Sequence, residues 1–274
     1  MLSLALSIAA AHGLLRSPQR ACRLTPRRAR IQIEDSEAGV GRALCDLIVT
    51  EYEACVASKG SFSFAISGGS MLKMLGLLDG SDALDWSKCT MGFVSHRCLP
   101  LDDDGATYAK ARPAFLDSWL DRGLAVVSPT GTTDAEAEAD AYEAALRETV
   151  GVDDEGYPAF DLCLIGVGLD GHVGSIYPQI PDVESDRAVV PITGVDGMGN
   201  VSTKLSLSIK AMLAAKRSVV ACAGKSKKAP LGKARAMVRA LEADETPMSF
   251  PASALRESAT WLLDEDSAAL LLKT

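Results

Sequence analysis

Apolar residues recur along the chain in two alternating spacings, one typical of helices and one typical of buried strands. At residues 37–58 they fall three and four positions apart, which predicts a helix with one buried face. The following stretch, SFSFAIS at residues 61–67, is rich in β-forming side chains and runs into two glycines, which predicts a strand and a tight turn. The spacing at residues 71–78 then predicts a short helix.

The same alternation continues to the C-terminus. It predicts strands at residues 89–95, 124–127, 160–166, 204–208, 218–223 and 260–263, and helices at residues 105–120, 134–150, 227–243 and 264–272. Residues 190–203 are predicted to form the longest irregular loop. Apolar strands separated by helices predict one α/β domain, with a mainly parallel sheet covered by helices on both faces.

The first 33 residues differ from the rest of the chain. They contain six arginines and no acidic residue, and the first carboxylate is Glu34. An apolar opening followed by an arginine-rich, acid-free stretch is typical of a transit peptide. The alternative is an ordered basic helix, which Pro18 and Pro26 disfavour. We therefore predict a targeting leader at residues 1–33 and a single domain at residues 34–274, with a plastid or mitochondrial destination and the cytosol as the alternative.

Composition excludes several classes of protein. The 274 residues are 47% apolar and carry a net charge of −8, so the chain is expected to form a full core and to repel nucleic acids and acidic membranes. The seven cysteines are scattered without a C-x-x-C pair, which favours reduced, buried thiols over a metal centre.

Glycine-rich turns follow several of the predicted strands. In parallel sheets ligands bind beyond the carboxyl ends of the strands, so these turns are the candidate site. The turn Ser67, Gly68, Gly69 and Ser70 can direct backbone N–H groups at a phosphate, although a plain tight turn capped by Ser70 is the alternative. Arg97 after the second strand and Lys225 after the strand at residues 218–223 could add positive charge to an anion site.

The turn after the strand at residues 160–166 is the most informative. Its glycines surround Asp170 and His172, two residues apart at the mouth of the sheet. An imidazole can accept a proton from water near neutral pH, and a neighbouring carboxylate can orient the ring, so the pair suits a general base. A loop histidine without a catalytic role is the alternative. Together, the turns favour acid/base chemistry on a small phosphorylated substrate.

The sequence GVGLDGHVGSIYP at residues 166–178 resembles the signature of the 6-phosphogluconolactonase family, which reads approximately GMGPDGHTASLFP in most members. Further similarities follow in the same order over the chain from residue 37 onward: Ser67–Ser70 to an SGGS phosphate loop, Asp85-Trp86 to a DW pair, Arg97–Pro100 to the end of a DERxVP segment, Lys204–Ser208 to an RITLT strand, Ala223–Lys225 to a GxGK turn, Pro251–Ser253 to a PAS segment, and Trp261–Asp264 to a WFLDE ending.

This resemblance implies a Rossmann-like, three-layer α/β sandwich related to glucosamine-6-phosphate deaminase, and hydrolysis of 6-phospho-D-glucono-1,5-lactone without a metal or organic cofactor. It implies that His172 activates water and that Asp170 shapes the loop. Ser67 to Ser70, Arg97, Lys204 and Lys225 would surround the phosphate and carboxylate oxygens. We expect a monomer or weak homodimer whose partner is this phosphosugar lactone, with no nucleic-acid or membrane partner.

The chain departs from the family pattern in three places. Ser95 and His96 stand where the family usually has Asp-Glu, Lys204 replaces an arginine, and Val173-Gly174 replaces Thr-Ala. Two alternatives remain open. One is a deaminase-like aldose–ketose isomerase, whose base would fall at the position of Ser95. The other is a catalytically weak sugar-phosphate binding protein, because both carboxylates are missing.

Overall fold

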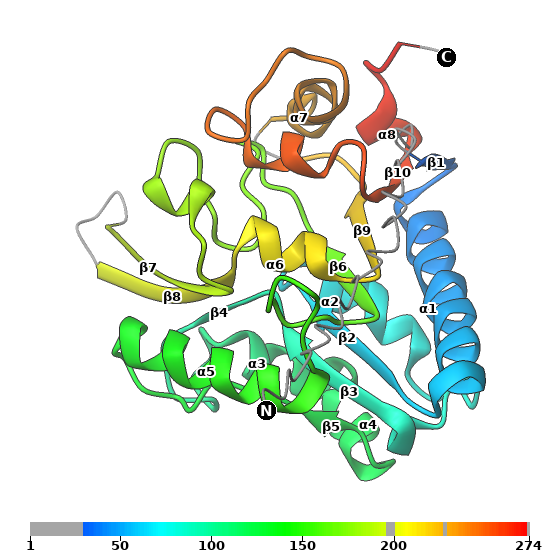
Figure 1. Cartoon of the computed structure of the whole chain (residues 1–274). Helices are drawn as coiled ribbons and strands as arrows, with labels where there is room; N and C mark the ends of the chain where they lie inside the picture. Colours follow the sequence, from blue (N-terminus) through cyan, green and yellow to red (C-terminus); the bar gives the residue numbers. More distant parts are fainter. Residues whose placement is uncertain (1–29, 196–200, 227–228, 273–274) are drawn as a thin grey trace, which may run out of the picture.

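The computed structural model describes residues 30–195, 201–226 and 229–272, and helices and strands alternate along most of this length (Figure 1). The helices are α1 (Glu37–Lys59), α2 (Ser70–Leu75), α3 (Thr107–Ala111), α4 (Asp117–Asp121), α5 (Ala135–Val150), α6 (Ile209–Ala214), α7 (Gly232–Leu241) and α8 (Glu265–Ala268). The strands are β1 (Arg30–Glu34), β2 (Phe62–Ile66), β3 (Cys89–Phe93), β4 (Ser95–Arg97), β5 (Ala125–Val126), β6 (Leu162–Ile165), β7 (Val189–Val195), β8 (Val201–Leu207), β9 (Arg217–Cys222) and β10 (Thr260–Asp264).

The main sheet is parallel and contains the strands in the order β1-β10-β9-β6-β2-β3-β5. After β2 the chain adds β3 and β5 on one side and then returns to place β6 on the other side of β2. The direction of strand addition therefore reverses between β2 and β6. At such a reversal the connecting segments leave on opposite faces and open a crevice beyond the carboxyl ends of the strands. The predicted fold class is confirmed.

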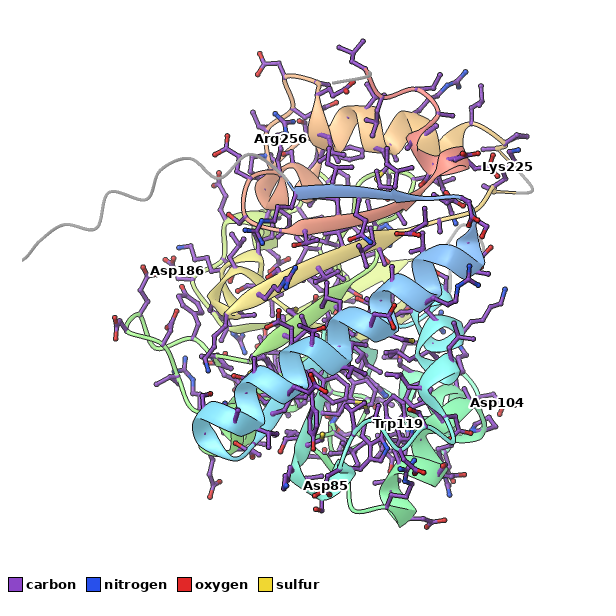
Figure 2. All side chains as sticks on the ribbon, turned by 90° about the vertical axis from the view of Figure 1, so that its right-hand side faces the viewer. Asp85, Asp104, Trp119, Asp186, Lys225 and Arg256 are labelled. Atoms are coloured by element: carbon purple, nitrogen blue, oxygen red, sulfur yellow. The ribbon has the colours of Figure 1, made fainter. Side chains whose placement is uncertain are left out.

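Helices cover both faces of this sheet because its strands are apolar on both sides. Phe62 and Phe64 of β2 meet Tyr52 of α1 and Trp119 of α4 on one face, in edge-on ring contacts. Figure 2 shows α1 crossing this face. On the opposite face, the hydroxyl of Tyr142 in α5 hydrogen-bonds the backbone at the end of β3. Each large apolar side chain buried in this way contributes about 1.5–3 kcal/mol.

A second, antiparallel sheet contains β4, β8 and β7 in that order. Residues 190–203 were predicted to be an irregular loop, and this prediction is wrong: β7 and β8 pair from Val189 and Leu207 to Val195 and Val201. Pro191 lies within β7 and weakens its strand signal. Pairing with β8, which the local sequence does not reveal, supplies the backbone hydrogen bonds that stabilise it.

Strand β1 corrects the predicted N-terminal boundary. Its five residues, Arg30 to Glu34, pair with β10 over its whole length. Residues 30–33 thus belong to the domain, although they were assigned to the leader because Arg30 continues the acid-free stretch. The rest of the predicted leader, residues 1–29, lies outside the described part of the chain.

Three predicted helices are shorter or more broken than expected. The helix at residues 105–120 consists of α3, a π-helical turn (Arg112–Leu116) and α4. The helix at residues 227–243 begins only at Gly232, and residues 227–228 of that prediction lie outside the described residues. The helix at residues 264–272 is reduced to the four residues of α8.

The cysteines and helices fit the compositional expectations as far as the structure describes them. Six cysteines are free thiols in buried positions, which confirms that prediction for all but Cys22, outside the described ranges. Among the described helices, none is both long and apolar enough to cross a bilayer.

Candidate active site

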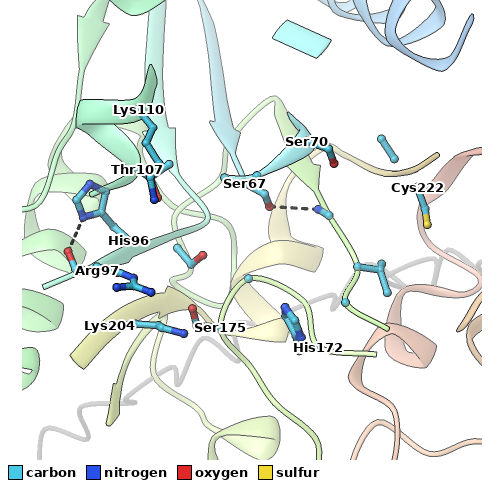
Figure 3. Close-up of a pocket in the computed structure, with 18 of the residues that line it drawn as sticks. Ser67, Ser70, His96, Arg97, Thr107, Lys110, His172, Ser175, Lys204 and Cys222 are labelled. Carbon is cyan, nitrogen blue, oxygen red and sulfur yellow. Dashed lines mark hydrogen bonds between the residues drawn. The ribbon is translucent and has the colours of Figure 1, made fainter. Parts of the chain in front are cut away.

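A pocket of about 370 Å³ opens at the strand reversal between β2 and β6 (Figure 3). Its walls come from the turns after β2, β6 and β9 and from strands β4 and β8 of the second sheet. The site residues that the sequence predicted contribute seven lining positions: Ser67, Gly68, Gly69, Ser70, Arg97, His172 and Lys204. Segments separated by more than 100 positions in the sequence therefore meet in one cavity.

The turn after β2, residues Ser67 to Ser70, forms one wall of the pocket. The Ser67 hydroxyl accepts a hydrogen bond of 3.2 Å from the N–H of Gly166, which joins the turns after β2 and β6. Gly69 has a φ of +70°, a conformation that favours glycine, and α2 starts at the next residue, Ser70. The first N–H groups of a helix have no partner within it, so this turn can donate them to an anion.

His172 and Asp170 form a direct pair at the pocket. The imidazole Nδ1 lies 2.6 Å from Oδ1 of Asp170, and the same oxygen accepts the backbone N–H of His172 at 3.2 Å. Partial burial acts to raise the pKa of Asp170, but the charge of His172 and these hydrogen bonds outweigh it and leave the pKa below its usual value. An ionised carboxylate only accepts hydrogen bonds, so Nδ1 carries a proton, and in the neutral form of the ring the lone pair is on Nε2.

The glycines of this loop make room for the pair. A methyl group on Gly168 would collide with the His172 ring and with Oδ1 of Asp170. Gly171 has a φ of +89°, and a methyl group there would lie 2.5 Å from the ring carbons of Phe250. A larger side chain at Gly168 would therefore displace the Asp170–His172 pair, and one at Gly171 would strain the backbone and collide with Phe250.

Arg97 and Lys204 face each other across two strands. They occupy the same register position of the antiparallel β4–β8 pair, and both line the pocket. Like charges directly opposite each other on neighbouring strands repel and destabilise the pairing. Two cations that converge on a cavity, in a chain of net charge −8, therefore indicate a site for an anion.

Ser95 and His96 have separate roles in β4. His96 is buried, its Nε2 accepts the N–H of Tyr108 at 3.1 Å, and its Nδ1 lies 2.6 Å from the carbonyl oxygen of Arg97. Because Nε2 is the acceptor, Nδ1 carries the proton and donates it to that carbonyl. Burial lowers the pKa of His96, which favours this neutral form. His96 thus connects the strand of Arg97 to helix α3, and Ser95 lines the pocket beside it.

The structure does not bring Lys225 into the pocket. Its ammonium instead pairs with Asp266 at 2.8 Å. Lys233, at the second position of α7, lines the pocket and donates to the carbonyl oxygen of Ala223. Lys233 was not predicted as a site residue because the helix was expected to start at residue 227. A lysine in the first turn of a helix opposes the helix dipole, and this signal could have indicated an anion.

Other lining residues that were not predicted include Thr107, Lys110 and Tyr177. Thr107 and Lys110 come from α3, and the Thr107 hydroxyl lies against Gly68, where an added Cβ would approach it to 3.3 Å. Tyr177 stands beside His172, with 4.8 Å between the ring centroids. Within the described residues, no group of three or more His, Cys, Asp or Glu side chains is arranged to hold a metal ion.

The chain is similar in sequence to proteins of a known family. The family model of glucosamine-6-phosphate isomerases/6-phosphogluconolactonase matches residues 35–263. A 6-phosphogluconolactonase of Synechocystis is 30% identical over 80% of this chain and 89% of its own length. The "6-phosphogluconolactonase 3, chloroplastic" of Arabidopsis thaliana is 31% identical over 55% of this chain and 49% of its own length.

The fold is also found among solved structures. The 6-phosphogluconolactonase of Trypanosoma brucei superposes with a TM-score of 0.75 at 23% identity, over 90% of this chain and 100% of that one. The family match covers the main sheet except β1, together with the turns that line the pocket. The chain belongs to the glucosamine-6-phosphate isomerase/6-phosphogluconolactonase family.

Proposed function

We propose that this protein hydrolyses 6-phospho-D-glucono-1,5-lactone to 6-phospho-D-gluconate, the second step of the oxidative pentose phosphate pathway. The observation that carries the proposal is that His172 of the Asp170–His172 pair lines the same pocket as the opposed cations Arg97 and Lys204. The Asp170–His172 pair supplies a base, and the two cations supply an anion site. Hydrolysis of a negatively charged ester requires both. The relatives named as lactonases support the same reaction.

In the proposed reaction, the neutral imidazole of His172 acts as the base. Its Nε2 takes a proton from water while the water oxygen attacks the lactone carbonyl, and Asp170 stabilises the imidazolium that forms. The resulting tetrahedral intermediate expels the ring oxygen, which takes the proton back from Nε2. The ester bond is broken, a hydroxyl and a carboxylic acid are formed, and the imidazole is returned to its starting state. The acid then releases its remaining proton to solvent and becomes the carboxylate of the product.

The cationic side of the pocket holds the phosphate. The planar guanidinium of Arg97 can bind two phosphate oxygens at once, whereas Lys204 acts as a point charge. Lys110 and Lys233 line the same pocket and add positive charge around the substrate. Holding the phosphate there fixes the lactone carbonyl relative to His172, which lowers the entropy loss in the transition state.

The position of Ser95 distinguishes this reaction from aldose–ketose isomerisation. An isomerase of this family needs a carboxylate base in the segment that contains Ser95, and a serine hydroxyl does not remove a carbon-bound proton at neutral pH. The nearest side chain in sequence, His96, is held by Tyr108 and the Arg97 carbonyl, so it is not free to replace that base. We therefore favour the lactonase.

A coupled assay with freshly generated lactone tests the proposal. The full chain should accelerate ring opening above the spontaneous rate, and His172→Ala should lower kcat by at least about 10²-fold, the loss expected for a positioned general base. Calorimetric binding of 6-phosphogluconate serves as the control, since His172→Ala leaves the cationic side intact. Binding without acceleration would identify a sugar-phosphate binding protein, and near-normal turnover of His172→Ala would remove His172 from the mechanism.

We further propose that residues 1–29 direct the protein to the plastid. These residues contain five arginines and no acidic residue, and the chloroplastic relative from Arabidopsis thaliana supports this destination. A fluorescent protein that carries residues 1–29 at its N-terminus should enter plastids. Fluorescence in mitochondria or in the cytosol would contradict the proposal.

A further inference from the structure

Strand β1 leaves one edge of the main sheet open. It is the last strand of the sheet order and has β10 as its only strand neighbour among the described residues. Its first four residues are exposed, including Ile31 at 42% and Ile33 at 53%. Figure 2 shows β1 as the outermost strand of the sheet in that view, beside β10. Proteins usually protect such an edge with charged side chains, proline or a bulge; β1 has charges only at its two ends, Arg30 and Glu34, and has neither a proline nor a bulge.

The sequence of this edge is complementary to itself. We propose that a second copy of this chain pairs with β1 in an antiparallel, two-fold symmetric arrangement centred on Gln32. The strand reads Arg-Ile-Gln-Ile-Glu, so this arrangement places Arg30 opposite Glu34 of the partner subunit and Ile31 opposite Ile33 of the partner subunit. A symmetric contact uses the same surface twice, and only a strand that reads as its own complement satisfies it with opposite charges.

The two faces of β1 fit this arrangement. Gln32 and Glu34 line a polar groove with Arg42 and Asp46 of α1, so the even-numbered side chains lie on the α1 face. Side chains alternate along a strand, which puts Ile31 and Ile33 together on the other face. Pairing two copies would join four isoleucines into one apolar cluster and remove part of their surface from water.

The predicted dimer leaves both active sites free. None of the β1 residues lines the pocket at the β2–β6 reversal. The pairing would join the two main sheets edge to edge through β1, and the backbone hydrogen bonds would supply affinity while the Arg30–Glu34 pairs select the register. The dimer is therefore independent of the proposed lactonase activity.

Charge reversal tests the pairing. The mass of the full chain is measured by sedimentation equilibrium over a series of concentrations, and it should rise from 28.8 kDa toward twice that value. Arg30→Glu and Glu34→Arg should each weaken dimerisation by roughly tenfold or more, because each creates two like-charge pairs. The double variant should restore it, since the charges are again opposite. Glu257→Arg, an exposed charge reversal in another region, is the matched control.

Disulfide formation tests the register. At the two-fold axis the Gln32 side chains of the two copies face each other, so Gln32→Cys should form an intermolecular disulfide under mild oxidation in a Cys22→Ser background. Glu34→Cys should not, because the two introduced cysteines would stand roughly 13 Å apart along the strands.

Two results would overturn the proposal. One is a monomeric mass at every concentration, which would also result if another segment of the chain covered the edge. The other is a dimer that none of the charge reversals affects, which would place the interface elsewhere. Lactonase activity is measured on the same samples, so failure of the pairing and failure of the proposed function are recorded separately.

Discussion

The ammonium of Lys204 lies 2.6 Å from the hydroxyl oxygen of Tyr177, and the tyrosine ring stands next to the imidazole of His172. The Lys204 ammonium also lies 5.0 Å from the ring centroid, within the range of a cation–π contact. Tyr177 therefore contacts both Lys204, on the cationic side of the pocket, and His172. Under the proposed function, this contact would couple the position of the phosphate to that of the reacting carbonyl.

Tyr177→Phe removes the hydroxyl and keeps the ring. The Lys204 ammonium loses one hydrogen-bond acceptor and becomes less ordered, so KM should rise roughly threefold to tenfold, the value of one such hydrogen bond. Because the ring still packs beside His172, kcat should stay within about twofold of wild type. Steady-state kinetics with fresh lactone provide both constants. An unchanged KM would show that this contact does not order the phosphate site.

Lys233→Ala should impair substrate binding, whereas Lys225→Ala should not. Lys233 lines the pocket, and its loss should raise KM roughly fivefold or more, as expected for removal of a charge-assisted contact to phosphate. Lys225 is paired with Asp266 outside the pocket, so its variant is the matched control. The reverse ranking of KM values would return the phosphate contact to Lys225, as the sequence analysis predicted.

His96 should make the protein less stable in mild acid. Burial lowers its pKa from the ordinary 6.5, so between the two pKa values His96 is protonated in the unfolded chain but not in the folded protein. The stability linked to His96 is therefore present above about pH 6.5 and is lost as the pH falls through the depressed folded pKa. In the protonated ring Nε2 would no longer accept the Tyr108 N–H. Thermal melts of wild type should show Tm falling below that pH, and His96→Gln should flatten this slope; parallel slopes would contradict the assignment.

Asp161 should stabilise the opposite end of the sheet. It is buried, and its carboxylate binds Lys59 at 2.8 Å, Lys216 at 2.7 Å and the N–H of Ser63 at 2.8 Å. Burial acts to raise the pKa of Asp161, but the hydrogen bonds from Lys216 and Lys59 outweigh it, so the pKa lies below 3.8. Asp161→Asn should lower the free energy of unfolding by about 2–4 kcal/mol at neutral pH.

Urea unfolding at several pH values checks this prediction. Since the pKa is depressed, the contribution of Asp161 is present above pH 3.8 and is lost as the pH falls through the lower folded value, so wild type and variant should converge in acid. Asp82→Asn, at a fully exposed partner of Arg122, should change little. A constant difference between wild type and Asp161→Asn down to low pH would contradict the role of ionised Asp161.

Much of the main sheet could be predicted because its central strands are rich in apolar and β-forming residues. All residues of β2 and β6 are buried, and the glycine turns that follow them are visible in the sequence. The edge strand β1 and the second sheet were harder to predict. Strand β1 has exposed side chains, and β7 and β8 stabilise each other by pairing, so their local sequences carry weak signals.

The amino-acid sequence alone determined the local chemistry. Asp170 and His172 are two residues apart in a glycine-rich turn, so their side chains are close enough to pair. Strands that are apolar on both faces also require helices to cover them. Tertiary structure decided which distant cations join them. Arg97 and Lys204 meet through strand pairing across about a hundred residues, and Lys233 rather than Lys225 reaches the pocket because of where α7 begins. Periodicity records how each segment buries its own apolar face, whereas the registry between distant segments depends on the packing of the whole molecule.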